Sequence, residues 1–185
     1  MTRLAGALVA MSALKVTTAL GSFTIALHDL QAPATCDYFR RLAESGALDG
    51  GAVFRITTTA EDAAHAIEII QFGTSKGLNE HRTRIPHETT AKTGLAHRRW
   101  TASAARMDPG EVYASVFICM RDEPSLDSGG TRHVDGLGFA AFGEVVTGHD
   151  VLKTIFSHAR HGELLSTPIR IESVAFIWPT KDTSR

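Results

Sequence analysis

Eight short segments of the chain have the alternating or continuous apolar character of β-strands, whereas only two have the period of an amphipathic helix. In chain order, strands are predicted at Lys15–Leu20, Phe23–Leu27, Ala52–Ile56, Ile67–Gln71, Thr101–Ala105, Ser115–Met120, Phe139–Val146 and near Ile169–Ile177. Gly21 and Ser22 lie between the first two strands, so we expect a hairpin there. This pattern predicts a mainly β protein, with antiparallel strands closed into a barrel and helices plugging its ends.

The clearer of the two predicted helices is Pro33–Ser45. It begins with proline, which suits the first turn of a helix, carries an apolar stripe, and ends before Gly46. The second helix is predicted at Asp150–Ser157, with Asp150 as its N-cap. The segments 72–100, 106–114 and 121–138 are predicted as long irregular loops, which in a compact domain are usually functional.

The length of 185 residues suits a single hydrophobic core, and neither a repeat nor a linker divides the chain. We therefore expect one domain over residues 1–185, with its core at about 15–178 and terminal extensions at 1–14 and 179–185.

The apolar run Leu4–Leu14 follows Arg3 and has two interpretations. It ends at Lys15 without a small-residue cleavage site, which favours a cytoplasmic protein; export with residues 1–13 as a signal segment is the alternative. Cys36 and Cys119 form no C-x-x-C pair, which is typical of buried thiols in a reducing compartment. No segment has the roughly 20 apolar residues that a membrane helix needs, so no membrane partner is expected.

Charge and motifs argue against several other classes of function. The net charge of −1 provides no field that would attract nucleic acid. The nine histidines include no i, i+4 pair on a predicted helix, so we expect no metal. The run 136–141 matches G-x-G-x-x-A, but a strand follows it where a dinucleotide site needs a helix, so no organic cofactor is expected either.

Four segments occur in an order that resembles the cyclophilins, the peptidyl-prolyl cis-trans isomerases. They are Phe54-Arg55, the strand end Ile69-Ile70-Gln71, the run Ser115–Cys119, and the stretch 138–152, whose FGEVVTGHDVL is similar to the family's FG-x-V-x-x-G-x-D-V-V. The resemblance extends from about Val16 to Val174 and implies an eight-stranded antiparallel barrel capped by two α-helices.

The resemblance also implies the site and its activity. Arg55 falls on the catalytic arginine of the family, and Gln71 resembles the glutamine that holds this arginine and hydrogen-bonds the substrate backbone. The apolar cup for the proline ring is implied at Phe117, Ile69 and Leu126, and the strand edge that pairs with the peptide is implied at Ala105 and Arg106. The expected partners are proline-containing peptides or unfolded protein clients, bound by a monomer.

Several positions depart from the family pattern. The family's F-H-R is Val53-Phe54-Arg55 here, and a longer segment, Thr57–Ala66, joins the arginine and glutamine strands. Counting back from Gln71 places Glu68 at the aromatic wall of the pocket. Ser115 replaces a second glutamine, Phe139 stands at the pocket histidine and can supply part of the apolar wall, and Ser125 falls near the tryptophan that holds cyclosporin. We therefore expect lower activity than in typical relatives and weak cyclosporin sensitivity.

Two alternatives stay open at this point. The barrel could be a proline-peptide binding module or chaperone with little or no turnover. A hydrolase that uses Ser115 with a loop histidine is also conceivable, although the chain contains no G-x-S-x-G elbow.

Overall fold

The computed structural model describes residues 11–59, 66–74, 80–160 and 162–179. Its strands are β1 (Ala13–Thr18), β2 (Gly21–Leu27), β3 (Ala52–Thr57), β4 (Ile69–Gly73), β5 (Thr83–Arg84), β6 (Thr101–Arg106), β7 (Glu111–Cys119), β8 (Ala140–Thr147) and β9 (Leu164–Ile177). Its helices are α1 (Pro33–Glu44), α2 (Thr90–Thr93), α3 (His149–Phe156) and the 3₁₀ turn η1 (Pro124–Leu126).

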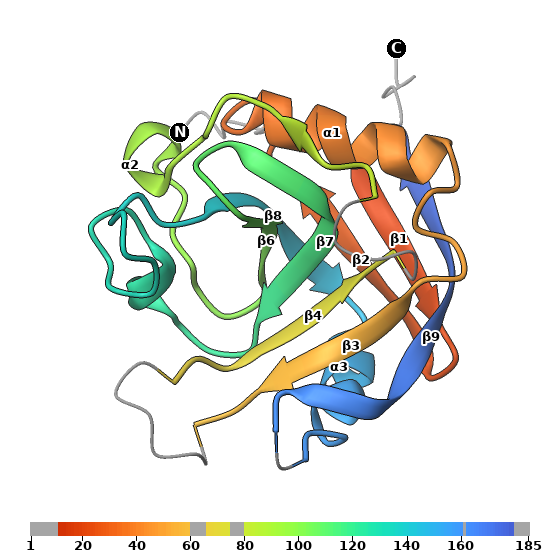
Figure 1. The fold of residues 1–185 in the computed structure, drawn as a ribbon. Helices are drawn as coiled ribbons and strands as arrows, with labels where there is room; N and C mark the ends of the chain where they lie inside the picture. Colours follow the sequence, from red (N-terminus) through yellow and green to blue (C-terminus); the bar gives the residue numbers. More distant parts are fainter. Residues whose placement is uncertain (1–10, 60–65, 75–79, 161, 180–185) are drawn as a thin grey trace, which may run out of the picture.

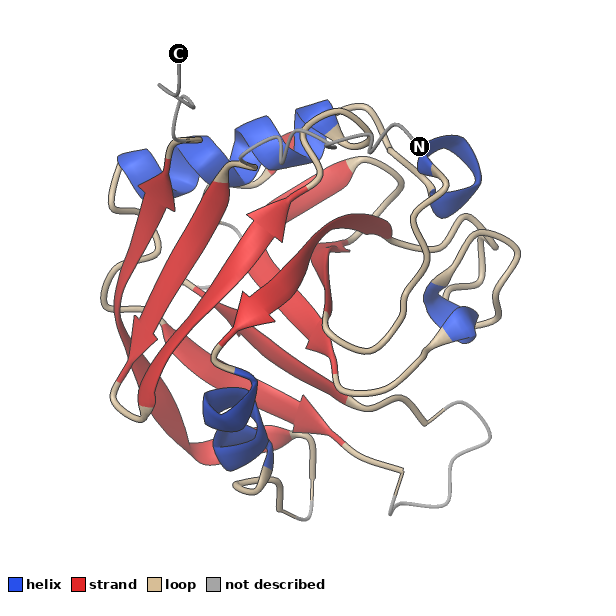
Figure 2. Cartoon of the chain, turned by 180° about the vertical axis from the view of Figure 1, so that it is seen from behind, coloured by secondary structure: helices blue, strands red, loops and turns tan. Residues whose placement is uncertain are grey.

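The sheet closes on itself. Its strand order is β4-β3-β9-β1-β2-β8-β6-β7-β5, and β4 also pairs with β7, so eight strands form a ring and the short β5 is attached to β7. Every pairing between these strands is antiparallel. Figures 1 and 2 show α1 across one end of the barrel and α3 near the other. The predicted eight-stranded barrel with two capping helices is confirmed, with one strand and two short helical segments added.

Helix α1 ends where the sequence indicated. Gly46 has a φ of 69°, the left-handed conformation that glycine adopts without strain. The backbone N–H of Ala47 donates to the carbonyl of Leu42 over 3.0 Å, and that of Gly46 donates to Ala43 over 3.1 Å. This is a Schellman motif, which satisfies carbonyls that the helix end leaves without partners.

The start of α1 depends on a residue far away in the sequence. The Glu88 carboxylate accepts hydrogen bonds from the backbone N–H groups of Ala34, at 3.0 Å, and Thr35, at 2.9 Å. A carboxylate at this end also interacts favourably with the helix dipole. Proline alone indicated where the helix begins, and the residue that satisfies its first N–H groups comes from the loop before α2.

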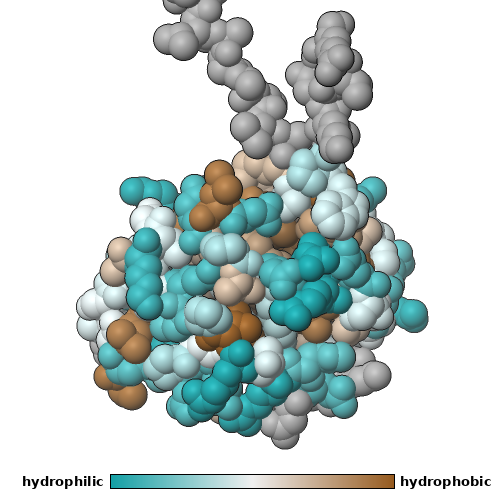
Figure 3. All heavy atoms as spheres, turned by 90° about the horizontal axis from the view of Figure 1, so that it is seen from above, coloured by the Kyte–Doolittle hydropathy of each residue, from teal (hydrophilic) through white to brown (hydrophobic). Residues whose placement is uncertain are grey.

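The outward side of α1 carries charged residues. Arg40 pairs with Glu44 at 2.6 Å and Arg41 pairs with Asp37 at 2.9 Å. The face of the molecule seen from above, over α1, is accordingly mostly hydrophilic with scattered apolar side chains (Figure 3). Within the described residues, no helix is long and apolar enough to cross a membrane.

Three local predictions were wrong. The first hairpin turns at residues 19 and 20, because Gly21 and Ser22 already belong to β2. The N-cap of α3 is Gly148, so Asp150 lies inside the first turn, where its carboxylate accepts from Lys153 at 3.3 Å. The stretch 106–114 is no long loop, because β7 begins at Glu111 and only residues 107–110 separate it from β6. Most of residues 1–13, which the alternative interpretation takes as a signal segment, lies outside the described residues.

The two faces of β7 serve two different clusters. Val112, Ala114, Val116 and Ile118 point into the main hydrophobic core, which fills the barrel. Tyr113, Phe117 and Cys119 belong to a second, smaller apolar cluster. Since side chains alternate along a strand, this second cluster lies on the outer face of the barrel. All nine residues of β7 are nevertheless buried, because loops cover that outer face.

Candidate active site

Arg55, Gln71 and Phe117 lie side by side across three neighbouring strands. Arg55 of β3 is in register with Gln71 of β4, and Gln71 is in register with Phe117 of β7. Cross-strand neighbours on one face have Cβ atoms about 5 Å apart, close enough for their side chains to interact. Pairing of the strands thus brings a cation, an amide and an aromatic ring together.

An irregularity in β3 brings Arg55 onto this outer face. The pairing of β3 with both β4 and β9 shifts register between Val53 and Arg55. Val53 and Ile56 both belong to the barrel core, although strict alternation would place them on opposite faces. The extra residue, Phe54, restores the outward direction of Arg55, as a β-bulge does. A permanent cation can therefore follow two apolar residues without entering the core.

These three residues border a pocket of about 250 Å³. The structure brings all eight predicted site residues to it: Arg55, Ile69, Gln71, Ala105, Arg106, Phe117, Leu126 and Phe139. Four further residues that we did not predict also line it: Ile67, Tyr113, Arg132 and His133. Ile67 could have been found from the two-residue period of the predicted strand Ile67–Gln71. Tyr113 lay in a stretch predicted as a loop, and Arg132 and His133 lie on a loop that has no such period.

Aromatic contacts shape the apolar part of the pocket. The rings of Phe117 and Phe139 meet edge to face, with centroids 5.4 Å apart, and the ring of His133 lies 6.1 Å from that of Phe139. Leu126 is almost fully buried in the same cluster. Phe139 thus forms part of the apolar wall.

The Arg55 guanidinium is held by two partners. Its Nε donates to Oε2 of Glu163 over 2.8 Å, and its Nη2 forms an ion pair with the same oxygen. Its Nη1 donates to Oε1 of Gln71 over 3.2 Å. The Arg55 side chain retains 24% of its exposure, so the cation stays accessible from the pocket.

Gln71 is fixed in turn by Ser115. The Nε2 of Gln71 donates to the Ser115 hydroxyl over 3.0 Å, and that hydroxyl donates to the carbonyl of Phe72 over 3.0 Å. Gln71 and Ser115 are both buried, and burial also raises the pKa of the neighbouring Tyr113 phenol, which therefore stays neutral. The Ser115 hydroxyl is thus committed to an amide and a carbonyl, an arrangement that does not support the hydrolase alternative.

Arg106 is buried and anchors a loop. Its Nε donates to the carbonyl of Gly138 over 2.8 Å, and its Nη2 pairs with Asp135 at 2.8 Å. Hydrogen bonding from Arg106 lowers the pKa of Asp135 from its ordinary value of 3.8 to about 2. The guanidinium also lies over the Phe139 ring, 5.1 Å from its centroid. Arg106 therefore ties residues 135–139 to the pocket.

Ala105, the other residue of the predicted peptide-binding edge, sits at an irregularity of β6. The β6–β7 register shifts between Ala104 and Arg106, so Ala105 lies inside the shift. A residue in such a shift is left without a regular ladder partner.

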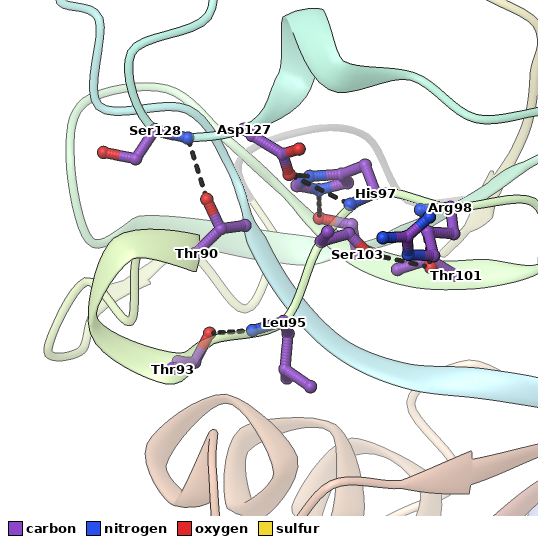
Figure 4. A network of polar contacts seen from close by, with 10 residues as sticks. Thr90, Thr93, Leu95, His97, Arg98, Thr101, Ser103, Asp127 and Ser128 are labelled. Atoms are coloured by element: carbon purple, nitrogen blue, oxygen red, sulfur yellow. Dashed lines mark hydrogen bonds and ion pairs between the residues drawn. The ribbon is translucent and has the colours of Figure 1, made fainter.

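A buried polar network surrounds His97, which lies behind the pocket residue Phe117; Figure 4 shows this network. The His97 ring contacts Asp127 through Nδ1 at 2.7 Å and Ser103 through Nε2 at 2.9 Å. Burial by itself raises the pKa of Asp127, but hydrogen bonds from the side chain and backbone of His97 hold it below its ordinary value. The His97 ring stacks against Phe117, with centroids 6.0 Å apart, so the network fixes one wall of the cup from behind.

The prediction that Glu68 stands at the aromatic wall of the pocket was wrong. Ile67, Ile69 and Gln71 line the pocket, because alternate residues share a face, and Glu68 between them is not among the lining residues. Its backbone N–H donates to Glu123 over 2.7 Å instead. Ser125 lies in η1 beside Leu126. Residues 60–65 of the longer predicted segment lie outside the described residues.

No three side chains of His, Cys, Asp or Glu are grouped for metal binding in the part of the chain that the structure describes.

Solved structures share this architecture. A crystal structure of a cyclophilin type peptidyl-prolyl cis-trans isomerase from Cryptosporidium parvum superposes with a TM-score of 0.71 at 19% sequence identity, covering 92% of this chain and 99% of that one. A second structure of that protein, determined in the presence of the dipeptide Ala-Pro, gives a TM-score of 0.70 at 20% identity and covers 90% and 99% of the two chains. At these identities the similarity concerns the fold.

Sequence comparisons carry the assignment further. A peptidyl-prolyl cis-trans isomerase of Streptomyces antibioticus is 28% identical over 173 residues, which cover 90% of this chain and 99% of that protein. Peptidyl-prolyl cis-trans isomerase B of Escherichia coli strain K12 is 28% identical over 160 residues, 83% of this chain and 93% of that protein. The family model described as cyclophilin type peptidyl-prolyl cis-trans isomerase/CLD matches residues 13–176. The chain therefore belongs to the cyclophilin-type peptidyl-prolyl cis-trans isomerase family.

Proposed function

We propose that this protein accelerates rotation about X-Pro peptide bonds, with Arg55 stabilising the twisted amide while the proline ring occupies the cup formed by Ile69, Phe117, Leu126 and Phe139. The substrates are proline-containing peptides or unfolded protein clients. The observation that carries the proposal is the placement of the Arg55 guanidinium at the edge of an apolar pocket of about 250 Å³, in register with Gln71 and Phe117.

The chemistry of the bond explains why a cation is useful there. Rotation has a barrier of about 18–20 kcal/mol, because the amide loses its resonance as it twists. In the twisted state the prolyl nitrogen regains its lone pair and accepts a hydrogen bond, which the planar ground state does not. A donor aimed at this nitrogen binds the transition state more strongly than the substrate, and this difference lowers the barrier.

The pocket supplies the other requirements of such a reaction. Arginine remains charged in proteins, and its donors form a rigid fork. Gln71 contacts the guanidinium and is itself fixed by Ser115, so the donor is held before the substrate arrives. An apolar cup holds the ring without a covalent step, and the irregular edge at Ala105 offers backbone groups to an extended peptide.

The proposal is tested by the cis-to-trans rate of a prolyl tetrapeptide with wild type, Arg55→Ala and, as a matched control, Arg170→Ala. Arg170 is exposed on β9 and does not line the pocket. Loss of one preorganised donor costs on the order of 10²-fold or more in rate. We expect a loss of this order for Arg55→Ala and an unchanged rate for Arg170→Ala.

The same experiment separates catalysis from binding alone. If wild type and Arg55→Ala give the same rate and both bind the tetrapeptide in a titration, the protein is a proline-peptide binding module. The binding module is considered as a second function because Ser115 and Phe139 differ from the residues that the family pattern has at these positions. A wild-type rate equal to the uncatalysed rate would also exclude the isomerase proposal.

A further inference from the structure

The carboxylate of Glu163 occupies a defined edge of the Arg55 guanidinium. One oxygen, Oε2, accepts from Nε over 2.8 Å and also contacts Nη2. The Nε and Nη2 groups share one side of the planar fork, whereas the far end of the fork is formed by Nη1 and Nη2. Glu163 lies immediately before β9, which pairs with β3 through Arg55 and Leu164, so the backbone holds the two side chains close together.

Counting donors shows what remains for a ligand. Arginine has five N–H donors. Nε and one hydrogen of Nη2 are engaged by Glu163, and one hydrogen of Nη1 is engaged by Gln71. Among the described residues, one hydrogen on Nη1 and one on Nη2 are left without a partner, and both lie on the terminal nitrogens of the fork. The two partners thus leave the terminal part of the guanidinium to the pocket that Arg55 lines.

A free arginine side chain would sample many orientations at this site. Holding such a side chain in one conformation costs entropy, and this cost is reduced if a partner fixes the orientation in the unbound protein. Glu163 does this from the Nε–Nη2 edge of the guanidinium, using one of the two Nη2 hydrogens. The Glu163 side chain is 52% exposed, so water screens its negative charge. That charge therefore cancels the positive field of Arg55 only in part.

We propose that Glu163 is a positioning residue for the isomerase reaction: its carboxylate holds the side edge of the Arg55 guanidinium so that the terminal N–H groups face the prolyl nitrogen. This inference rests on the proposed function. Glu163 acts through Arg55 and does not itself touch the substrate. Because the orientation of Arg55 matters most as the amide twists, Glu163 affects turnover more than peptide binding.

The test compares Glu163→Ala, Glu163→Gln and the control Glu172→Ala, which changes an exposed glutamate on β9. We expect Glu163→Ala to lower kcat/KM for a prolyl tetrapeptide by about fivefold, the size of effect that a partly exposed ion pair can have. The Kd of the tetrapeptide should stay within about twofold, since binding depends mainly on the apolar cup. Glu163→Gln should lose less, because its amide oxygen still accepts a hydrogen bond, and Glu172→Ala should match wild type.

Two further measurements distinguish positioning from a general structural role. Raising the salt concentration to about 1 M screens exposed ion pairs, so the wild-type rate should fall toward that of Glu163→Ala, whose own rate should hardly change. In ¹H–¹⁵N spectra, the Nε–H signal of Arg55, identified by its loss in Arg55→Lys, should exchange with water faster in Glu163→Ala than in wild type.

The outcomes separate this inference from the function on which it rests. Equal rates for wild type and Arg55→Ala would overturn both. A slow Arg55→Ala variant together with a Glu163→Ala variant that is as fast as wild type, or faster, would overturn the positioning role alone. An unchanged exchange rate of the Arg55 Nε–H in Glu163→Ala would likewise show that Glu163 does not hold the guanidinium.

Discussion

The side-chain amide of Gln71 donates a 3.0 Å hydrogen bond to the Ser115 hydroxyl, which lies two residues along β7 from the direct partner of Gln71. By its resemblance to the family, Ser115 stands where relatives have a second glutamine. The shorter serine still reaches Gln71, and its hydroxyl donates a hydrogen bond to the carbonyl of Phe72. Gln71 is therefore held at both ends, by Arg55 through its oxygen and by Ser115 through its nitrogen.

Replacing Ser115 by alanine should disturb this arrangement. The Nε2 of Gln71 and the carbonyl of Phe72 would both lose a partner in a buried site, which costs about 1–3 kcal/mol of unfolding free energy. Gln71 would also hold Arg55 less firmly, so we expect kcat/KM to fall by roughly threefold to tenfold, the equivalent of about 1 kcal/mol. Urea unfolding and the tetrapeptide assay measure the two effects.

Ser166→Ala is the matched control, because Ser166 lies exposed on β9. It should change neither quantity. Full retention of both stability and rate in Ser115→Ala would contradict the role assigned to the Ser115 hydroxyl.

Phe139→Ala should weaken substrate binding without altering the Arg55 guanidinium, the proposed hydrogen-bond donor. The ring of Phe139 packs edge to face on Phe117 and lies under the Arg106 guanidinium. Without this ring the proline of the substrate buries less apolar surface, which is worth about 25 cal/mol per Å², so the widened cup should raise KM about tenfold. Since Arg55 and Gln71 are untouched, kcat should change little. The control is Val134→Ala, which alters a fully exposed residue of the same loop and should match wild type. A fall in kcat with constant KM in Phe139→Ala would contradict the assignment of Phe139 to the proline cup.

The ion pair between Arg106 and Asp135 should make stability depend on pH in the acid range. The pKa of Asp135 in the folded protein is about 2, below its ordinary value of 3.8. The ionised carboxylate therefore stabilises the fold fully above about pH 4. This contribution is lost as the pH falls from about 4 to about 2, where the folded carboxyl takes up its proton. Asp135→Asn, which cannot ionise, should therefore show a shallower fall of the urea midpoint over this interval than wild type. Parallel curves for the two proteins would disprove the assignment.

The barrel was predictable because its strands obey simple periods. The alternation of Phe23, Ile25 and Leu27 fixes one buried face of β2, and the proline and glycine at either end of α1 mark its bounds. The errors occur where tertiary contacts decide. The residues before Ser115 join β7 because β5 and β6 pair with them, and the start of α1, although marked by its proline, is satisfied by Glu88 from another part of the chain.

The site was predictable only in part for the same reason. The pairs Arg55–Gln71 and Gln71–Phe117 follow from strand register, and the family resemblance supplied that register in advance. The partners from loops could not be found in this way: Glu163 on Arg55, Asp135 on Arg106, and the His97 ring behind Phe117. No local pattern connects residues so distant in the chain, because their proximity depends on how the loops fold over the outer face of the barrel.

Two glycines of the pocket loop allow a test in which the backbone conformation is matched. Gly136 and Gly138 have φ values of 65° and 67°, so alanine is strained at both, by about 1–2 kcal/mol. At Gly136 an added Cβ meets nothing within 4 Å, whereas at Gly138 it would lie 2.5 Å from the carbonyl oxygen of Leu126. That carbonyl accepts a 3.0 Å hydrogen bond from the backbone N–H of Phe139, so Gly138→Ala must move two residues of the cup. We expect both variants to lose a similar amount of unfolding free energy because of the positive φ. Only Gly138→Ala should lose roughly 1–3 kcal/mol more, and only this variant should bind the tetrapeptide about tenfold more weakly. Urea unfolding and peptide titration of the pair measure this difference, and identical behaviour of the two variants would mean that the close approach of Gly138 to Leu126 does not shape the pocket.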